Sequence, residues 1–356
     1  MREFNVTGTC VKSRHYMADT SEKINEIVAL IDREKYFTIN RPRQYGKTTT
    51  LSLLRKRLEN DYTVLNLSFE KVGKESYVSV ESFLGMLYRN IKRVLTRLKE
   101  EVLLERLEGM KGITTFDEFD DFLTDFLSDS PKEVILLIDE CDDGSNNDVF
   151  LKFLGVLRNK YLLRAEDLDV SFKSVILAGI EDIIYWNIAT RFEIAMSFNE
   201  AEIQSLLKDY LSENSNTKID VKLIARKIQY LTNGYPLMVS YLCKMIHEDF
   251  EGDDKWSVQN LEHSANKLIV VKVPIFESFI KIIESHSDLM KLVHMILIED
   301  VSVPFGISTL AMEKGLQYGI LTRSEDNKLV IHNPIFEMKF YNYLIEYNKA
   351  MDVGCA

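Results

Sequence analysis

The sequence has few of the residues that form cross-links or bind metals. It holds only four cysteines among 356 residues, and no two of them form a CxxC pair. Its six histidines are scattered, so neither residue type shows the spacing of a zinc site. These absences exclude a disulfide scaffold and speak against metal-hydrolase and thiol-enzyme functions.

Long apolar segments are also missing. No uninterrupted run is longer than the one at 134–138, which has the length of a strand, whereas a membrane helix needs about 20 residues. The first residues contain no apolar segment of the kind found in secretory signals. We therefore expect a cytoplasmic protein without a membrane partner.

Positive charge is in the minority, because 44 Lys and Arg stand against 55 Asp and Glu, a net charge of -11. Such a chain lacks the overall field that drives non-specific binding to nucleic acid. The basic stretch between Lys92 and Lys99 is followed at once by glutamates, which is typical of a charged helix surface. A local contact with DNA stays open, but the net charge does not support it.

What the sequence does contain is typical of a globular protein, with 46% hydrophobic, 10% aromatic and 28% charged residues. At about 150 residues per domain, its length suggests two domains or three small ones. Helical and strand patterns alternate in the first half. Strands are expected at 36–39, 64–67, 134–138, 175–177 and 192–196, and helices at 21–34, from 51, at 79–110, 116–127 and 148–163. Strands separated by crossover helices predict an α/β fold with a parallel sheet.

The second half has a different pattern. Helices follow one another from 199 to about 284, and the remaining segment combines helices with an expected hairpin near 323–327. A strand at 329–331 and a final helix from Pro334 complete a winged-helix-like pattern. We therefore predict three domains, namely an α/β core at 1–198, a helical lid at 199–284 and a winged-helix-like domain at 285–356.

The segment between the first expected strand and the next helix has the composition of a phosphate-binding loop (P-loop). Gly46 lets the backbone approach an anion, and the following helix N-terminus supplies N–H groups. Lys47 would reach the β- and γ-phosphates of a nucleotide, and the Thr48 hydroxyl would bind Mg²⁺. The predicted nucleotide-binding residues here are Arg43, Gln44, Tyr45, Gly46, Lys47, Thr48 and Thr49. The alternative is a tight turn whose basic residues are merely solvated.

A second motif ends the strand at 134–138 with Asp139 and Glu140. Ligands of open α/β sheets bind at the carboxyl ends of the strands, so we expect Asp139 beside the loop, where it would hold Mg²⁺. Glu140 would then orient and deprotonate the attacking water, and both Glu140 and Lys47 are predicted catalytic residues. Asp142 and Asp143 follow, and capping of the next helix is favoured over Mg²⁺ support for them.

Together these segments resemble bacterial AAA-ATPase-like proteins, relatives of the archaeal and STAND-type P-loop ATPases. That group has an arginine in place of the first glycine of the loop, as at Arg41 here. The resemblance implies the sheet order 5-1-4-3-2, and it implies that Gly234 and Pro236 pack near an adenine. It rests on the runs at 36–51, 138–140, 145–151, 174–179, 186–189, 196–198, 234–236 and 331–336.

The leading hypothesis is a P-loop ATPase that binds ATP with Mg²⁺ and whose hydrolysis switches the lid and C-terminal domain between two arrangements. The alternative is a slow-turnover, nucleotide-dependent binding module that contacts DNA or a protein through its C-terminal domain. Both hypotheses leave room for a homo-oligomer or a protein partner. The sequence names neither the partner nor the activating signal.

Overall fold

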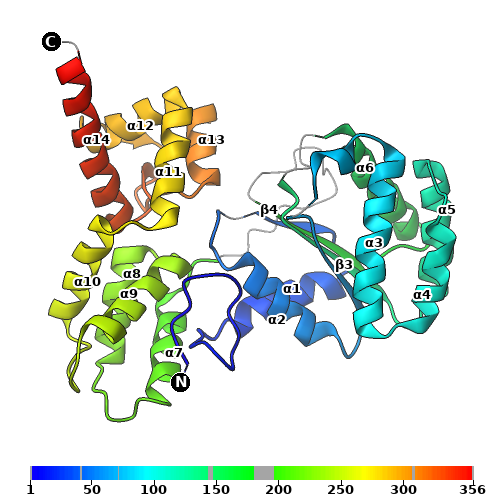
Figure 1. Cartoon of the computed structure of the whole chain (residues 1–356), viewed down its shortest axis with the longest axis horizontal. Coiled ribbons are helices and arrows are strands. Elements are labelled where there is room, and N and C mark those ends of the chain that lie inside the picture. Colours follow the sequence, from blue (N-terminus) through cyan, green and yellow to red (C-terminus); the bar gives the residue numbers. More distant parts are fainter. Residues whose placement is uncertain are drawn as a thin grey trace. The chain divides into compact units, whose positions relative to one another are not determined.

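The computed structural model describes residues 2–40, 42–70, 72–142, 147–179, 196–306 and 309–354. The chain divides into two compact units, whose elements are labelled in Figure 1. The sheet unit comprises Ser21–Arg41 and Lys47–Ile194, and the helical unit comprises Met1–Thr20, Pro42–Gly46 and Ala195–Ala356. The boundary between Gly46 and Lys47 therefore falls inside the predicted phosphate-binding loop.

The sheet unit is built on parallel strands that alternate with helices. Its strands are β1 (Phe37–Asn40), β2 (Thr63–Ser68), β3 (Val134–Asp139) and β4 (Ser174–Gly179), in the order β1-β4-β3-β2. Its helices are α1 (Ser21–Asp32), α2 (Lys47–Leu58), α3 (Val80–Leu98), α4 (Glu101–Leu107), α5 (Phe116–Ser128) and α6 (Asp148–Ala165), with short 3₁₀ turns η1 (Lys74–Tyr77) and η2 (Glu108–Met110). Figure 1 shows α1 and α2 on one side of the sheet and α3, α5 and α6 on the other.

The core forms because the central strands are apolar on both faces. Every residue of β3 and of β4 is buried, as expected for strands covered by helices on both sides. Alternate side chains, such as Leu136 and Ile138 of β3, pack with Phe83 of α3 and Phe153 of α6 in one cluster. Burial of this cluster fixes the register and hence where each strand ends.

The sheet and one helix differ from what the sequence predicts. The described residues hold a four-stranded sheet instead of five strands, although the order of these four strands is confirmed. The fifth expected strand, at 192–196, lies outside the described residues except for Met196. The helical region expected at 79–110 is broken because Lys99 adopts a left-handed conformation (φ 59°) and ends α3.

The helical unit contains helices and one small antiparallel sheet. Its helices are α7 (Glu200–Leu211), α8 (Val221–Thr232), α9 (Pro236–Asp249), α10 (Val258–Val270), α11 (Pro274–Ser285), α12 (Ser287–Leu297), α13 (Leu310–Gln317) and α14 (Pro334–Gly354). Its strands β5 (Val303–Pro304), β6 (Leu321–Arg323) and β7 (Lys328–Ile331) pair in the order β5-β7-β6. The winged-helix assignment and the three-domain division stay predictions.

The N-terminal residues belong to the helical unit. The Arg2 guanidinium forms ion pairs with Asp209 of α7 (2.8 Å) and with Glu213 (2.7 Å). Phe4 is buried and stacks on Tyr210 of α7, with 5.4 Å between the ring centroids. These contacts attach the segment before α1 to α7. In the described ranges no helix is both long and apolar enough to cross a membrane.

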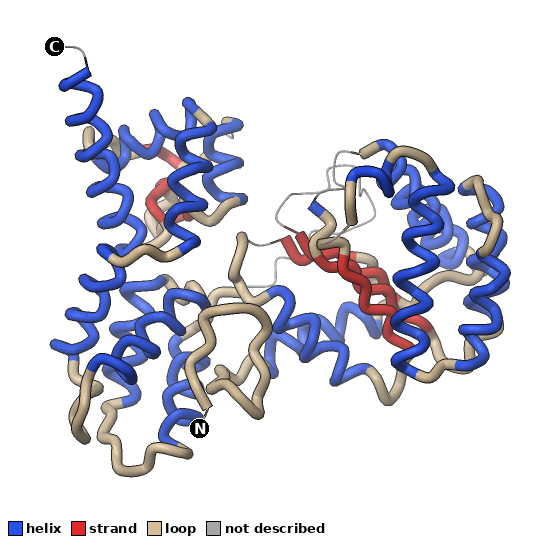
Figure 2. The backbone as a smooth tube through the Cα atoms, viewed as in Figure 1, coloured by secondary structure: helices blue, strands red, loops and turns tan. Residues whose placement is uncertain are grey.

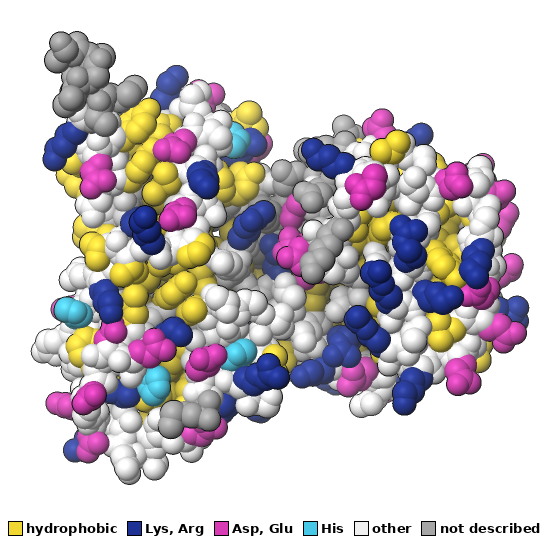
Figure 3. All heavy atoms as spheres, viewed as in Figure 1, with side chains coloured by type: hydrophobic (Ala, Val, Ile, Leu, Met, Phe, Trp, Pro, Cys, Tyr) yellow, Lys and Arg dark blue, Asp and Glu magenta, His cyan; other side chains and the backbone are white. Residues whose placement is uncertain are grey.

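Charged side chains of both signs share the surface of the sheet unit. On α3, the Lys92 ammonium lies 2.9 Å from a Glu108 carboxylate oxygen, and Lys111 pairs with the same carboxylate. Figure 3 shows Lys and Arg side chains beside Asp and Glu side chains on this face. The Lys92 ammonium of the basic stretch on α3 is therefore paired with a carboxylate.

Lys160 is the most deeply buried of the charged side chains that the structure describes in the sheet unit. Lys160 of α6 is 1% exposed, and its ammonium donates to Thr124 of α5 and to Asp169 (2.6 Å) and lies 3.6 Å from Asp120. Burial raises the pKa of Asp169, but hydrogen bonds from Lys160, from the Val170 N–H and from Thr124 outweigh it and lower that pKa. The cluster thus joins α5, α6 and the loop after α6 through one desolvated ammonium.

We predict that Lys160→Met destabilises the protein by about 3 kcal/mol, because the carboxylates of the cluster lose their buried counter-charge. Urea denaturation followed by circular dichroism measures the change. Lys152→Met is the matched control, since Lys152 is an exposed lysine on the same helix. Equal stability of the two variants would mean that the buried cluster does not stabilise the fold.

Candidate functional site

The loop between β1 and α2 turns sharply before the helix begins. Gln44 (φ 61°) and Gly46 (φ 79°) both have left-handed backbones, and α2 starts immediately afterwards at Lys47. A Cβ on Gly46 would meet no atom within 4 Å, so glycine is favoured by its positive φ and not by crowding. Arg41 lies outside the described residues.

The first turn of α2 meets the end of β3. The Thr48 hydroxyl donates a hydrogen bond to Asp139 Oδ2 at 2.9 Å. Lys47 and Asp139 are both buried, at 6% and 5% exposure, and Thr49 lies in the same helical turn. The sheet unit therefore brings together three of the predicted site residues, Lys47, Thr48 and Asp139.

The sheet register explains why the polar residues gather at one edge. Asn40 of β1 pairs with Gly179 of β4, and Asp139 of β3 pairs with Ala178 of β4 and with Ser68 of β2. Because the strands are parallel, all of these residues stand at the carboxyl edge, where the strands shown in Figure 2 end together. This is the edge at which open α/β sheets bind ligands.

Burial and charge oppose each other at this edge. Burial lowers the pKa of Lys47, and the nearby carboxylates of Asp142, Glu140 and Asp139 act against that shift. Burial raises the pKa of Asp139, against the Thr48 hydroxyl, the Glu140 N–H and the Lys47 ammonium. The site thus holds one desolvated ammonium among three carboxyl groups.

Glu140 follows directly after β3 with an unusual backbone. Its φ is 56°, in the left-handed region, which costs a glutamate about 1 kcal/mol. Its N–H donates to Asp139 Oδ1 at 3.0 Å, so the turn also helps to fix that carboxylate. Strained residues of this kind cluster at functional sites, and Glu140 stands beside the predicted site.

The favoured interpretation of Asp142 as a helix cap is wrong. The side chain of Asn147 caps α6 instead and accepts hydrogen bonds from the N–H groups of Val149 (2.9 Å) and Phe150 (3.4 Å). Asp142 lies against β4, where a Cβ on Gly179 would come within 2.7 Å of its Oδ1. In the sequence, the acidic residues that follow Asp139 were the feature that could have predicted a third carboxylate near Lys47. Asp143 lies outside the described residues.

Within the helical unit, segment 42–46 packs on residues from the C-terminal half. Tyr45 is buried at 4% exposure, and its hydroxyl forms a hydrogen bond with His332 Nε2. The ring centroid of Tyr45 lies 4.3 Å from that of Tyr235, whose hydroxyl donates to the Arg43 carbonyl at 2.5 Å. The side chains of Arg43 and Gln44 are exposed. Sequence reasoning missed Tyr235 and His332, although both lie in runs that carried the family resemblance.

Gly234 and Pro236 form the junction between α8 and α9. Gly234 has a φ of 68°, and a Cβ there would lie 2.0 Å from the Phe198 carbonyl oxygen. The Phe198 N–H donates to the Gly234 carbonyl at 2.8 Å, so close backbone contact requires glycine. Pro236 is buried in the first turn of α9. The contact of these residues with an adenine stays a prediction.

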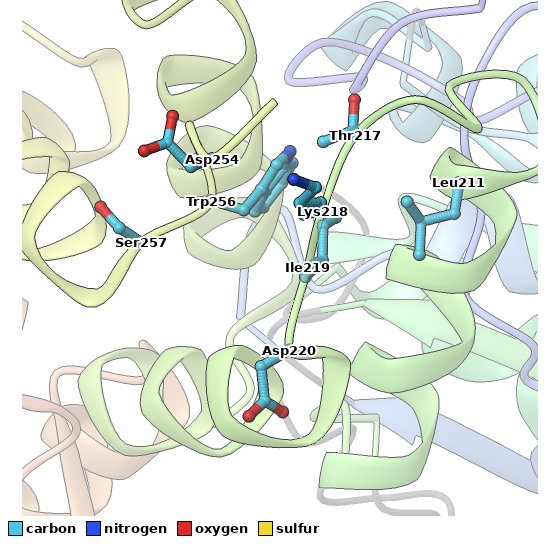
Figure 4. A pocket seen from close by; sticks show the side chains of 8 residues that line it. All are labelled: Leu211, Thr217, Lys218, Ile219, Asp220, Asp254, Trp256 and Ser257. Atoms are coloured by element: carbon cyan, nitrogen blue, oxygen red, sulfur yellow. The ribbon is translucent and has the colours of Figure 1, made fainter. Parts of the chain in front are cut away.

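The helical unit also has an open hollow of about 670 Å³ near the starts of α8 and α10, shown in Figure 4. Asp220 caps α8 by accepting from the Leu223 N–H, and Ser257 caps α10 by accepting from the Asn260 N–H. Its other polar lining residues are Thr217, Lys218, Asp254 and Trp256. None of the predicted site residues lines this hollow, and its capping groups serve the helices.

Comparison with known proteins finds a solved structure with the same fold. No protein-family model matches the sequence, and a search of curated proteins gave no match. A Walker-type ATPase of Pyrococcus abyssi matches the structure with a TM-score of 0.63 at 13% identity, over 94% of this chain and 99% of that chain. This likeness establishes a shared fold.

Two further structures match less closely. The ORC2 protein of Aeropyrum pernix, in its ADPNP-ADP complexes, has a TM-score of 0.45 at 10% identity and covers 93% of this chain and 92% of its own. RuvB of Thermotoga maritima has a TM-score of 0.45 at 12% identity and covers 92% and 95%. Agreement at this level adds nothing to the argument. From the first match, the expected resemblance to archaeal-type P-loop ATPases is confirmed for the fold.

Proposed function

We propose that the protein binds ATP together with Mg²⁺ at the start of α2 and hydrolyses it. The observation that carries this proposal is the hydrogen bond between Thr48 and Asp139, which joins the loop-helix motif to the end of β3. Two independent motifs of a phosphate site thereby share one location. The shared fold with a Walker-type ATPase supports the same conclusion.

Binding would depend on the start of α2. Backbone N–H groups of the loop and of the first helical turn favour an anion there, and the buried Lys47 ammonium would compensate the charge of the β- and γ-phosphates. The remaining predicted ligands are the exposed Arg43 and Gln44 of the loop and Thr49 of α2.

The donors at this edge suit Mg²⁺, which prefers oxygen ligands. Thr48 Oγ1 and Asp139 Oδ2 lie 2.9 Å apart, and these two residues would hold the ion. The described residues offer no group of three or more His, Cys, Asp or Glu as a metal site, which fits an ion that takes its other ligands from phosphates and water. When bound, Mg²⁺ would neutralise charge that develops on the phosphates.

Hydrolysis would depend on Glu140. Its position next to Asp139 supports a role in which its carboxylate orients the attacking water and accepts a proton from it. We infer that ATP hydrolysis switches the lid (199–284) and the C-terminal domain (285–356), and that Gly234 and Pro236 link this switch to the adenine. If no hydrolysis is measured, the alternative function, a slow-turnover and nucleotide-dependent binding module, is favoured.

We expect Lys47→Ala to abolish the rise in melting temperature that Mg·ATP produces in the wild type, because the phosphate charge loses its compensating ammonium. Differential scanning fluorimetry with and without Mg·ATP measures this. Lys56→Ala, an exposed lysine on the same helix, should keep the shift. An undiminished shift in Lys47→Ala would place the nucleotide elsewhere.

We expect Glu140→Gln to keep ATP affinity while phosphate release falls at least ~100-fold, the scale of general-base catalysis. Glutamine preserves shape and hydrogen bonding but cannot accept the proton. Glu133→Gln, at the other end of β3, is the control, because Glu133 pairs with Lys173 (3.3 Å) at the amino edge of the sheet. Turnover at the wild-type rate in Glu140→Gln would remove Glu140 from the mechanism.

A further inference from the structure

We propose that Tyr235 and His332 are positioning residues that hold the phosphate-binding loop in its binding conformation, an inference that rests on the proposed ATP site. Neither residue belongs to the loop, and neither is expected to touch the nucleotide. Both contact segment 42–46, which ends one peptide bond before Lys47. Tyr235, His332 and segment 42–46 all belong to the helical unit.

Tyr235 holds the loop backbone directly. Its hydroxyl donates to the Arg43 carbonyl at 2.5 Å, and its ring packs against Tyr45 at 4.3 Å between centroids. Tyr235 is fully buried, and this burial raises the pKa of its hydroxyl well above the ordinary value. The hydroxyl therefore stays protonated and donates to the loop at physiological pH.

His332 holds the loop through the side chain of Tyr45. Asn333 Oδ1 accepts from the Phe336 N–H at 2.9 Å, so the Asn333 amide nitrogen faces His332 Nδ1 at 3.1 Å. Because an amide nitrogen only donates, Nδ1 must accept, and the proton of the neutral ring lies on Nε2. The Nε2–H then donates to the Tyr45 hydroxyl. The Ser197 hydroxyl donates to the same oxygen at 3.4 Å.

The position of His332 is itself fixed by its backbone. Its N–H donates to the Ile320 carbonyl at 2.9 Å, and its carbonyl accepts from the Asn233 side chain at 3.1 Å. Burial lowers the pKa of His332 to about 4, so the ring is neutral at physiological pH and keeps the tautomer that serves Tyr45. The Nε2–H of His332 is therefore held in one orientation toward the Tyr45 hydroxyl.

The first residue of segment 42–46, Pro42, packs closely against the backbone of Gly319. Gly319, with a φ of 71°, lies so near Pro42 that a Cβ on it would come within 2.6 Å of Pro42 Cγ. Pro42, Arg43 and Tyr45 are thus each held by a residue from beyond 230. Loop amides that are fixed before binding lose less conformational entropy when they take up an anion.

The first test compares Tyr235→Phe with wild type in the full chain. The substitution removes only the hydroxyl, and ATP affinity measured by calorimetry should fall about fivefold, the loss expected for one hydrogen bond. In the absence of nucleotide, hydrogen exchange at residues 43–47 should become faster. Tyr210→Phe is the matched control, because it also removes the hydroxyl of a buried tyrosine, one that bonds to His247 (3.1 Å) and not to the loop.

The second test addresses His332. His332→Leu should weaken ATP binding and speed loop exchange, whereas His332→Gln, whose amide N–H can still reach the Tyr45 hydroxyl, should restore most of both. A purely structural role would give the two variants the same defect in melting temperature and no difference in loop exchange. Recovery by glutamine therefore separates positioning from packing.

Two results would overturn the inference. One is ATP affinity and loop exchange in Tyr235→Phe that match those of Tyr210→Phe, and the other is identical behaviour of His332→Gln and His332→Leu. A wild-type protein that binds no ATP would instead reject the proposed function. In that case loop exchange without nucleotide still decides whether Tyr235 and His332 hold the loop.

Discussion

The hydrogen bond from Thr48 to Asp139 is the interaction on which the candidate site depends. It joins residues 91 positions apart in the chain, one at the start of α2 and the other at the end of β3. The parallel register makes it possible, because it brings the carboxyl ends of the strands to one edge of the sheet. The apolar side chains of β3 and β4, buried on both faces, hold that register in place.

The chemistry of this edge follows from its imbalance of charge. One buried ammonium, that of Lys47, stands among the carboxyl groups of Asp139, Glu140 and Asp142. A nucleotide would bring further negative charge, which a cation in addition to Lys47 would compensate. The oxygen donors of Thr48 and Asp139 offer a place for Mg²⁺, and the electrostatics and the donor set thus lead to the same proposal.

The loop before Lys47 connects this chemistry to the helical unit. Segment 42–46 is assigned to that unit, while Lys47 and Thr48 belong to the sheet unit. Tyr235 and His332 hold the segment by its backbone and by the Tyr45 side chain. A change in the loop on nucleotide binding or release would therefore act on the α8–α9 junction and on the start of α14 through contacts that are already made.

The fold was largely predictable because its signals are local. The apolar run at 134–138, the strand-loop-helix pattern around Gly46 and the acidic pair Asp139-Glu140 each lie within a few residues. Apolar periodicity and glycine placement determine such elements without help from the rest of the chain. The order of the four described strands agreed with the family resemblance. The helix break at Lys99 was missed, because nothing in the apolar pattern marks a single left-handed residue.

The sequence by itself determined the residues of the predicted phosphate-binding loop, the acidic pair and the alternation of strands and helices. Only the tertiary structure decided that the Asp142 carboxylate acts on the pKa of Lys47 while Asn147 caps α6, since both residues are plausible caps by type. It also decided that Tyr235 and His332 reach segment 42–46 from about 190 and 290 positions away. The sequence shows the chemistry of each side chain. Which residue it contacts depends on how distant elements pack, and no local sequence pattern predicts that packing.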